Sequence, residues 1–189
     1  MDIFINESNG HTYLNGLITE ADVRNGNGRL YPYPIAKPAI FEMIQRIDNG
    51  EEIWSEREHP QRLEMDASLA CGKIVEVKWN DLKKNARCRV EVIDTTPAGR
   101  KLLEDIKNNV KVGISTRGSG RMNDDKIIEA IKFITADIVS IPSCQNCWLS
   151  ESTGELIPDD FIFEYDKKII TEMRLKDLAL LSTLERLQK

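Results

Sequence analysis

The hydrophobic and polar positions along the chain follow two periods, and each period predicts a different kind of element. Residues 12–24 carry apolar side chains spaced as in an extended strand, and the following Asn-Gly-Asn-Gly at 25–28 predicts a turn. Apolar residues then recur at helical spacing over 35–47, which predicts a helix. Asp48-Asn49-Gly50 is expected to end that helix, because glycine readily takes the left-handed conformation common after helices.

The middle of the chain predicts a hairpin followed by a second helix. Residues 70–93 alternate between apolar and polar on both sides of a polar connection at 80–85, as expected for two paired strands. Thr95-Thr96-Pro97 is typical of a helix start, because a hydroxyl can cap the first turn and proline suits the first helical position. We expect this second helix to run to about Asn109.

The last part of the chain is rich in strand-forming residues. Residues 110–116 predict a strand that enters a glycine-rich turn at 118–120. Residues 126–140 predict one or two buried strands, and 157–165 predict another. Strands with only a few helices between them suit a β-barrel or a folded sheet better than alternating βαβ units.

The length of 189 residues is compatible with one domain. From Thr171 onward leucines recur at three-residue steps, which predicts an amphipathic helix. We therefore expect one domain over residues 1–168, with its core at about 12–165. A C-terminal helix at 169–189 follows it as a candidate removable tail.

Composition narrows the class of protein. A net charge of −5 does not suggest a nucleic-acid binder, which would usually be basic. The N-terminus lacks the basic start and apolar run of a signal peptide, and no stretch approaches the roughly 18 apolar residues of a membrane span. We therefore expect a soluble protein made in a cytoplasm, with no contact with membranes and no direct contact with nucleic acid.

The four cysteines are expected to be free thiols, because the chain carries no export signal. Cys144 and Cys147 have the two-residue gap of zinc and redox sites. A zinc site would need two further ligands, and Cys71 and Cys88 are not paired at a matching spacing. No metal and no cofactor are expected.

Histidine is scarce, which narrows the search for a general base. The chain has two, His11 in a polar segment near the N-terminus and His59 just before the predicted hairpin. Pro60 is expected to hold His59 in an extended conformation, which would fix the direction of the imidazole. A surface histidine in a charged loop is the alternative.

Ser115 is the candidate nucleophile, because glycines flank it at 113 and 118. A serine hydroxyl needs a base to remove its proton and backbone N–H groups to stabilise the oxyanion, and glycine lets backbone come close. The segment matches neither the G-x-S-x-G nucleophile elbow nor a P-loop. An ordinary turn is the alternative.

Asp137 stands among apolar residues, so a buried carboxylate there would need a partner. If it accepts a hydrogen bond from His59 Nδ1–H, it fixes the tautomer and stabilises the imidazolium. The alternatives are a carboxylate that points outward or one paired with an arginine such as Arg117.

Four short stretches together resemble the prohead core protein proteases of large contractile-tailed phages, which are distantly similar to the herpesvirus assemblin-type maturation proteases. They occur in the same order and span roughly residues 20–150. The stretches are Asn27-Gly28-Arg29-Leu30-Tyr31-Pro32, Glu58-His59-Pro60, Val112-Gly113-Ile114-Ser115-Thr116-Arg117-Gly118 and Ala136-Asp137-Ile138-Val139-Ser140-Ile141-Pro142-Ser143.

The resemblance implies an α+β fold with a small β-barrel flanked by helices, similar to the herpesvirus proteases. It also implies a serine endopeptidase in which Ser115 attacks the scissile carbonyl and His59 moves the proton. The herpesvirus relatives have a histidine at the third position, where this chain has Asp137, and Glu58 is the alternative carboxylate. Gly113, Arg117 and backbone N–H groups near Ser115 or in the 142–145 turn are candidates to support the oxyanion or the substrate.

The resemblance also implies a role in virion maturation. Phage members of the family cleave scaffold, core and capsid proteins inside the assembling prohead in the host cytoplasm, after glutamate with Leu or Ile two positions earlier. Glu7 and Glu172 follow this pattern near the chain ends, which suggests self-trimming. A homo-oligomer is compatible with this role.

Two other functions compete with the protease. A non-catalytic assembly module of a phage particle could share the barrel, although it would not need His59 and Ser115 together. A phosphate-binding domain could use Gly118-Ser119-Gly120 with Arg117 and Arg121, but the sequence lacks both a P-loop and a G-x-G-x-x-G after a strand.

Overall fold

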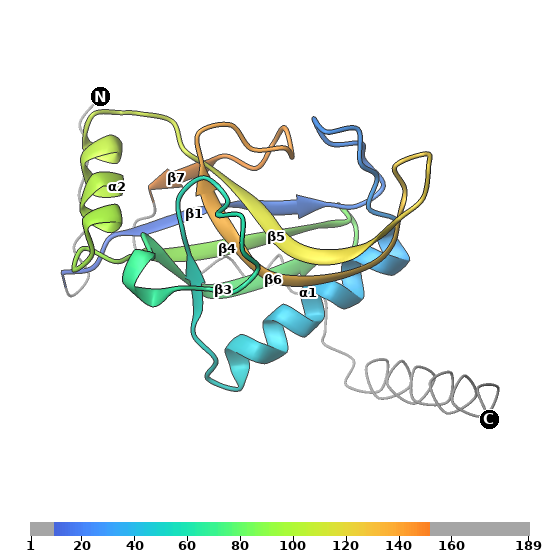
Figure 1. The fold of residues 1–189 in the computed structure, drawn as a ribbon, viewed down its shortest axis with the longest axis horizontal. Helices are drawn as coiled ribbons and strands as arrows, with labels where there is room; N and C mark the ends of the chain where they lie inside the picture. The colour runs from blue at the N-terminus through green and yellow to red at the C-terminus, as the bar shows by residue number, and fades with distance from the viewer. Residues whose placement is uncertain (1–9, 152–189) are drawn as a thin grey trace.

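The structure, a computed structural model, describes residues 10–151 of the chain (Figure 1). In chain order its elements are β1 (Tyr13–Glu20), α1 (Tyr33–Asp48), β2 (Ile53–Ser55), the short 3-10 helix η1 (Ala67–Leu69), β3 (Gly72–Asn80), β4 (Asn85–Val92), α2 (Pro97–Lys107), β5 (Gly113–Met122), β6 (Ile128–Val139) and β7 (Leu149–Glu151). Neither α-helix of this part of the chain has the length and apolar character that a membrane crossing requires.

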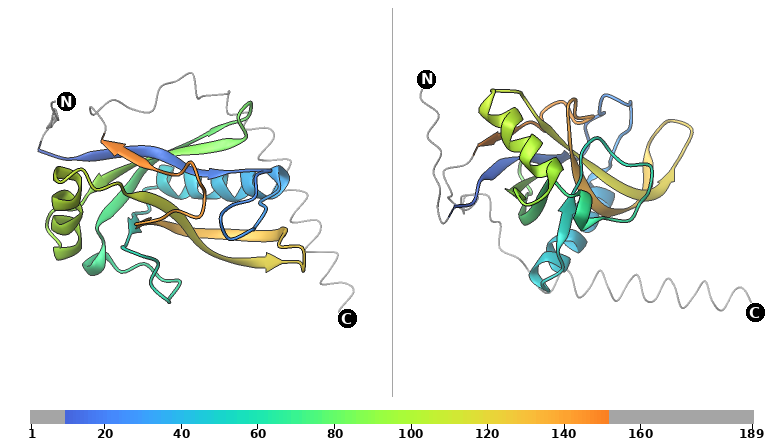
Figure 2. Two further views of the ribbon diagram at one scale, coloured as in Figure 1. Left: turned by 90° about the horizontal axis from the view of Figure 1, so that it is seen from above. Right: turned by 60° about the vertical axis from the view of Figure 1, so that its left-hand side comes forward.

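The strands form two antiparallel sheets, one of five strands in the order β2-β3-β4-β1-β7 and one made of β5 and β6. In Figure 2 the β5–β6 ribbon lies apart from the larger sheet, and α1 packs against β3 and β6. Single bridges, Ile138 of β6 with Arg57 and Gly113 of β5 with Trp148, connect the ribbon to residues just after β2 and just before β7 of the larger sheet. The mixed α+β class was predicted correctly. The described residues do not close into the expected barrel, because the two sheets share only these bridges.

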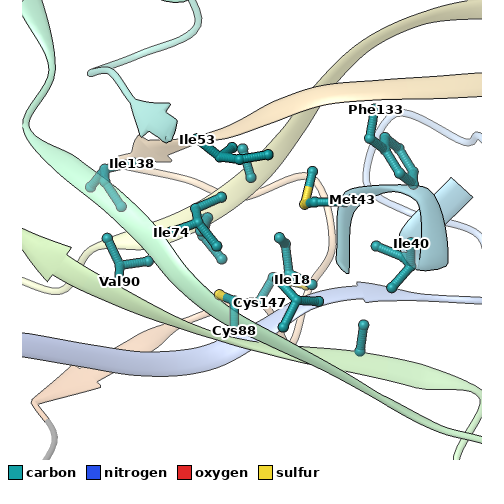
Figure 3. Packing of buried hydrophobic residues seen from close by; sticks show 14 of the residues in the cluster. Ile18, Ile40, Met43, Ile53, Ile74, Cys88, Val90, Phe133, Ile138 and Cys147 are labelled. Carbon is teal, nitrogen blue, oxygen red and sulfur yellow. The ribbon is translucent and has the colours of Figure 1, made fainter. Parts of the chain in front are cut away.

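One hydrophobic core fills the space between the two sheets and α1 (Figure 3). It includes Ile18 from β1, Ile40 and Met43 from α1, and Phe133 and Ile138 from β6, all of them buried. Because both sheets contribute to one core, the β5–β6 ribbon is held firmly against the rest of the domain.

Most of the predicted elements are present. The helix over 35–47 begins slightly earlier, at Tyr33, and Gly50 follows it at a φ of +83°. The hairpin is β3 and β4, and the second helix is capped by Thr96, whose Oγ1 accepts a hydrogen bond from Gly99 N at 3.0 Å. Residues 126–140 contain one strand, β6.

The glycine-rich turn predicted at 118–120 was wrong, because these residues continue β5. A Cβ on Gly118 would lie 2.2 Å from Lys132 O, and one on Gly120 would lie 2.2 Å from Ala130 O. The glycines thus permit close approach of β5 to β6 rather than a reversal of the chain. The reversal comes later, where Lys126 N donates to Asn123 O.

The strand predicted at 157–165 and the helix predicted at 169–189 lie outside the described residues. The division into a 1–168 domain and a C-terminal helix therefore stays a prediction.

Candidate active site

Asp137 is the most buried charged residue of the site, with no exposed surface. Its Oδ2 accepts a hydrogen bond of 2.8 Å from His59 Nδ1, and its Oδ1 accepts from Glu56 N at 3.1 Å and from Arg117 Nη2 at 3.2 Å. Arg117 Nε lies 2.9 Å from Oδ2 as a further ion-pair contact. These contacts replace the water that a buried carboxylate loses.

His59 reaches Asp137 because the segment after β2 runs along β6. Ile138 N donates to Glu56 O, and Glu58 N donates back to Ile138 O, at 2.9 and 3.0 Å. The Glu58 carboxylate accepts from Ser140 N at 2.8 Å and does not contact the imidazole. Asp137 is therefore the carboxylate that orients the ring, and about 40% of the His59 side chain remains exposed.

The extended conformation predicted for His59 was wrong. Glu58 and His59 have φ values of +55° and +42°, so two successive residues with side chains adopt the left-handed region. That region costs roughly 1–2 kcal/mol per residue. The hydrogen bonds to β6 and to Ser140 outweigh the local preference set by Pro60. Backbone strain held by its surroundings in this way is concentrated at functional sites.

Ser115 lies on β5 directly opposite Asp137 on β6. Directly opposed residues of an antiparallel pair project from the same face, so the hydroxyl and the carboxylate share one side of the ribbon. Ser115 is almost fully buried, and its Oγ shares a hydrogen bond of 3.3 Å with Ser143 Oγ. No hydrogen bond joins Ser115 to His59 within residues 10–151. The site therefore contains an assembled His59–Asp137 pair and a nearby serine that is bonded elsewhere.

Arg117 connects Asp137 to the segment that carries His59. Besides Asp137, its guanidinium donates to Glu56 Oε1 at 2.8 Å and to the carbonyl oxygens of Arg62 and Glu64 at 2.9 and 3.0 Å. Arg62 pairs with the other oxygen of Glu56. These contacts favour a positioning role for Arg117 over the oxyanion support expected from the sequence.

Gly113 contributes space rather than a contact with the reacting groups. A Cβ there would lie 2.6 Å from both Cγ and Cδ of Pro142. Glycine thus lets the segment between β6 and β7 pack on the start of β5, which brings Ser143 beside Ser115.

A small pocket opens next to Ser115, between the β1–α1 segment and the β6–β7 segment. Gly26 N donates to Ser143 O at 2.6 Å and ties these two segments together, and Figure 1 shows them at the same end of the molecule. The pocket encloses about 50 Å³. Its lining includes Glu20, Arg24, Ser115, Thr116, Ser143 and Asn146. Sequence reasoning missed Arg24 and Ser143 as pocket residues, because no local pattern marks either one.

The cysteines do not supply a nucleophile. Burial raises the pKa of Cys71 and of Cys88 to about 12, so both remain protonated thiols at neutral pH. The expectation of four free thiols was wrong for the other two, since Cys144 and Cys147 form a disulfide. The turn in which Cys147 N donates to Cys144 O places their Cα atoms 5.3 Å apart, a normal disulfide separation. The prediction of free thiols relied on the absence of an export signal, whereas the two-residue gap that is typical of redox sites already favoured a disulfide.

The other histidine lies at a different place. His11 pairs with Glu91 of β4 at 2.7 Å and contributes nothing to the contacts of Asp137. Residues 10–151 also contain no group of three or more side chains placed to hold a metal ion.

Comparison with known proteins gives the family. A family model described as prohead core protein serine protease matches residues 6–155. The chain belongs to this family. This prohead protease is 30% identical to the prohead core protein protease of enterobacteria phage T4 over 144 residues, which cover 73% of this chain and 68% of the relative.

A solved structure agrees with this assignment. The structure of the bacteriophage T4 capsid assembly protease, gp21, superimposes with a TM-score of 0.62 at 27% sequence identity. The match covers 67% of this prohead protease and 80% of that chain. His59, Ser115 and Asp137 all lie inside the 6–155 range of the family match.

Proposed function

We propose that this protease is a serine endopeptidase in which Ser115 is the nucleophile, His59 the general base and acid, and Asp137 the residue that orients His59. The main observation in support of this proposal is the 2.8 Å hydrogen bond from His59 Nδ1 to the fully buried Asp137, which lies directly opposite Ser115. A carboxylate can only accept, so Nδ1 carries the proton and Nε2 is left with a lone pair for the serine proton.

Proton transfer from Ser115 to His59 becomes possible when Ser115 exchanges its hydrogen bond with Ser143 for one with His59 Nε2. The proposal is supported by the exposure of the imidazole, whose Nε2 has no described protein partner. Catalytic hydrogen bonds often tighten only when substrate binds. A maturation protease must also stay inactive until its shell is built, and a serine bonded away from its base provides such a resting state.

The proposed substrates are the core, scaffold and capsid proteins of the phage, cleaved inside the assembling prohead after glutamate with Leu or Ile two residues earlier. The T4 relatives are a prohead core protein protease and a capsid assembly protease, which supports this class of substrate.

Self-trimming is expected after Glu7 and Glu172. Incubated full-length protein should lose both ends, as seen by intact-mass spectrometry, and Glu172→Gln should block only the C-terminal cut, because the amide lacks the negative charge that the protease is expected to bind before the scissile bond. A protein that keeps both ends while it cleaves a test peptide would exclude self-trimming and leave the peptidase intact.

Labelling with a fluorophosphonate tests the nucleophile. We expect the adduct on Ser115, no adduct in Ser115→Ala or His59→Ala, and an adduct still on Ser115 in Ser143→Ala. The last variant is the decisive control, because the two hydroxyls are 3.3 Å apart and either could react. Folded protein that takes no label on Ser115, either alone or together with core and capsid proteins of the prohead, would instead favour a non-catalytic assembly module.

A further inference from the structure

The pocket beside Ser115 contains one arginine that is held in place but not neutralised. Both N–H groups of Arg24 Nη1 are used, one on Gly28 O at 2.7 Å and one on Asp125 O at 3.0 Å. Carbonyl oxygens carry no net charge. No carboxylate of residues 10–151 pairs with this guanidinium.

The remaining edge of Arg24 has the shape that a carboxylate requires. Once Nη1 is occupied, Nε and Nη2 still present adjacent donors, and these have no described protein partner. Two parallel N–H groups of this kind bind a carboxylate in a bidentate manner. Because the two carbonyl contacts already fix the side chain, little conformational entropy is lost when a ligand binds.

The position of the pocket identifies which group of a substrate could enter it. Ser115 and Thr116 form part of its wall, so a substrate attacked by Ser115 places a residue adjacent to the scissile bond beside this pocket. The volume of about 50 Å³ exceeds the roughly 10–15 Å³ needed for one water, which leaves room for the end of a short acidic side chain.

Glu20 opposes the binding of a carboxylate in this pocket, because it places a negative charge in the same lining. Its Oε2 accepts a hydrogen bond of 3.0 Å from Asn146 Nδ2, which holds it toward the disulfide-bonded turn. Glu20 forms no ion pair with Arg24 within residues 10–151. The carboxylate of Glu20 is therefore bound by Asn146, and Nε and Nη2 of Arg24 stay without a carboxylate partner among these residues.

From these observations we infer that Arg24 is the specificity-determining residue that binds the carboxylate of the substrate residue preceding the scissile bond. The inference deepens the proposed function and rests on it, since it assigns to a particular side chain the recognition of an acidic residue. Arg24 contacts the substrate away from the reacting atoms and takes no part in proton transfer.

The test compares two peptides that differ only in glutamate or glutamine before the scissile bond, with the full chain as enzyme. Wild-type protein should cleave the glutamate peptide with the higher kcat/KM. Arg24→Ala should lower the glutamate-to-glutamine ratio by about 10–100-fold, the range for a lost charge-assisted hydrogen bond, and leave the glutamine peptide nearly unchanged. Arg24→Lys keeps the positive charge but loses the pair of parallel N–H donors, so it should give an intermediate ratio. This variant provides the test if Arg24→Ala does not fold.

Two matched variants make the result specific. Arg29→Ala removes an exposed arginine of the same segment that does not line the pocket, and Glu20→Gln removes the other charge from the lining. Both should keep the ratio at or above the wild-type value.

An unchanged ratio in the folded Arg24 variants, or an equal fall in Arg29→Ala or Glu20→Gln, would overturn the role of Arg24 while Ser115-dependent cleavage continued. Wild-type protein without any Ser115-dependent cleavage would overturn the proposed function and this inference together.

Discussion

Ser115→Ala is expected to lower kcat/KM for peptide cleavage by about 10⁵–10⁶-fold, and His59→Ala by a similar factor. A serine hydroxyl is nearly inert at neutral pH until a base takes its proton, and in the proposed site His59, held by Asp137, is the base that acts on Ser115. Because the two residues act on the same proton, the double variant should lose no more activity than either single variant.

Steady-state kinetics on a peptide with glutamate before the scissile bond measures this effect, with thermal unfolding as the check on folding. Ser119→Ala and His11→Ala are the matched controls. Ser119 is an exposed serine of the same strand, and His11 is the other histidine of the chain. Both should remain within about twofold of wild type. Losses that multiply in the double variant would contradict a shared proton transfer.

Much of the architecture could be predicted because short-range patterns determine it. The alternation over 70–93 reflects two strands with one face on the core, and the hydroxyl–proline pair at Thr96-Pro97 supplies its own helix cap. These features depend on neighbours a few residues away. The sequence therefore indicates them without any knowledge of the tertiary fold.

Features that depend on contacts between distant segments were predicted less well. Gly118 and Gly120 look like turn residues in sequence, but the nearby backbone of β6 is what requires them. The left-handed conformation of His59 depends on hydrogen bonds between its segment and β6. That strand begins about 70 residues later in the chain. Local sequence patterns could reveal neither the close approach at the two glycines nor the left-handed conformation of His59.

The candidate site shows the same division between local and distant information. Its individual residues could be proposed from the chemistry of scarce histidines, glycine-flanked serines and isolated carboxylates. The pairing of Asp137 with His59 and its pairing with Arg117 were both proposed as alternatives, and the sequence could not show that the carboxylate makes both contacts at once. His59 and Asp137 are 78 residues apart, and Arg117 joins them through backbone carbonyls that carry no side-chain signature.

Asp137→Asn is expected to lower kcat/KM by about 10⁴-fold, because the geometry survives with the wrong imidazole tautomer. Asparagine keeps one acceptor and gains one amide donor. Arg117 and the backbone N–H of Glu56 are both donors, so they should draw the amide oxygen toward themselves. The amide nitrogen would then donate to His59 Nδ1 and leave the proton on Nε2, where it blocks transfer from Ser115.

Glu58→Gln is the matched control for this variant, because Glu58 is next to His59 in sequence and was the alternative orienting carboxylate. Its carboxylate binds Ser140 rather than the imidazole, so we expect a loss below about tenfold, from a looser segment alone. Kinetics of both folded variants on one peptide decides between the two carboxylates. A larger loss in Glu58→Gln than in Asp137→Asn would transfer the orienting role to Glu58 and require the segment to rearrange in the active enzyme.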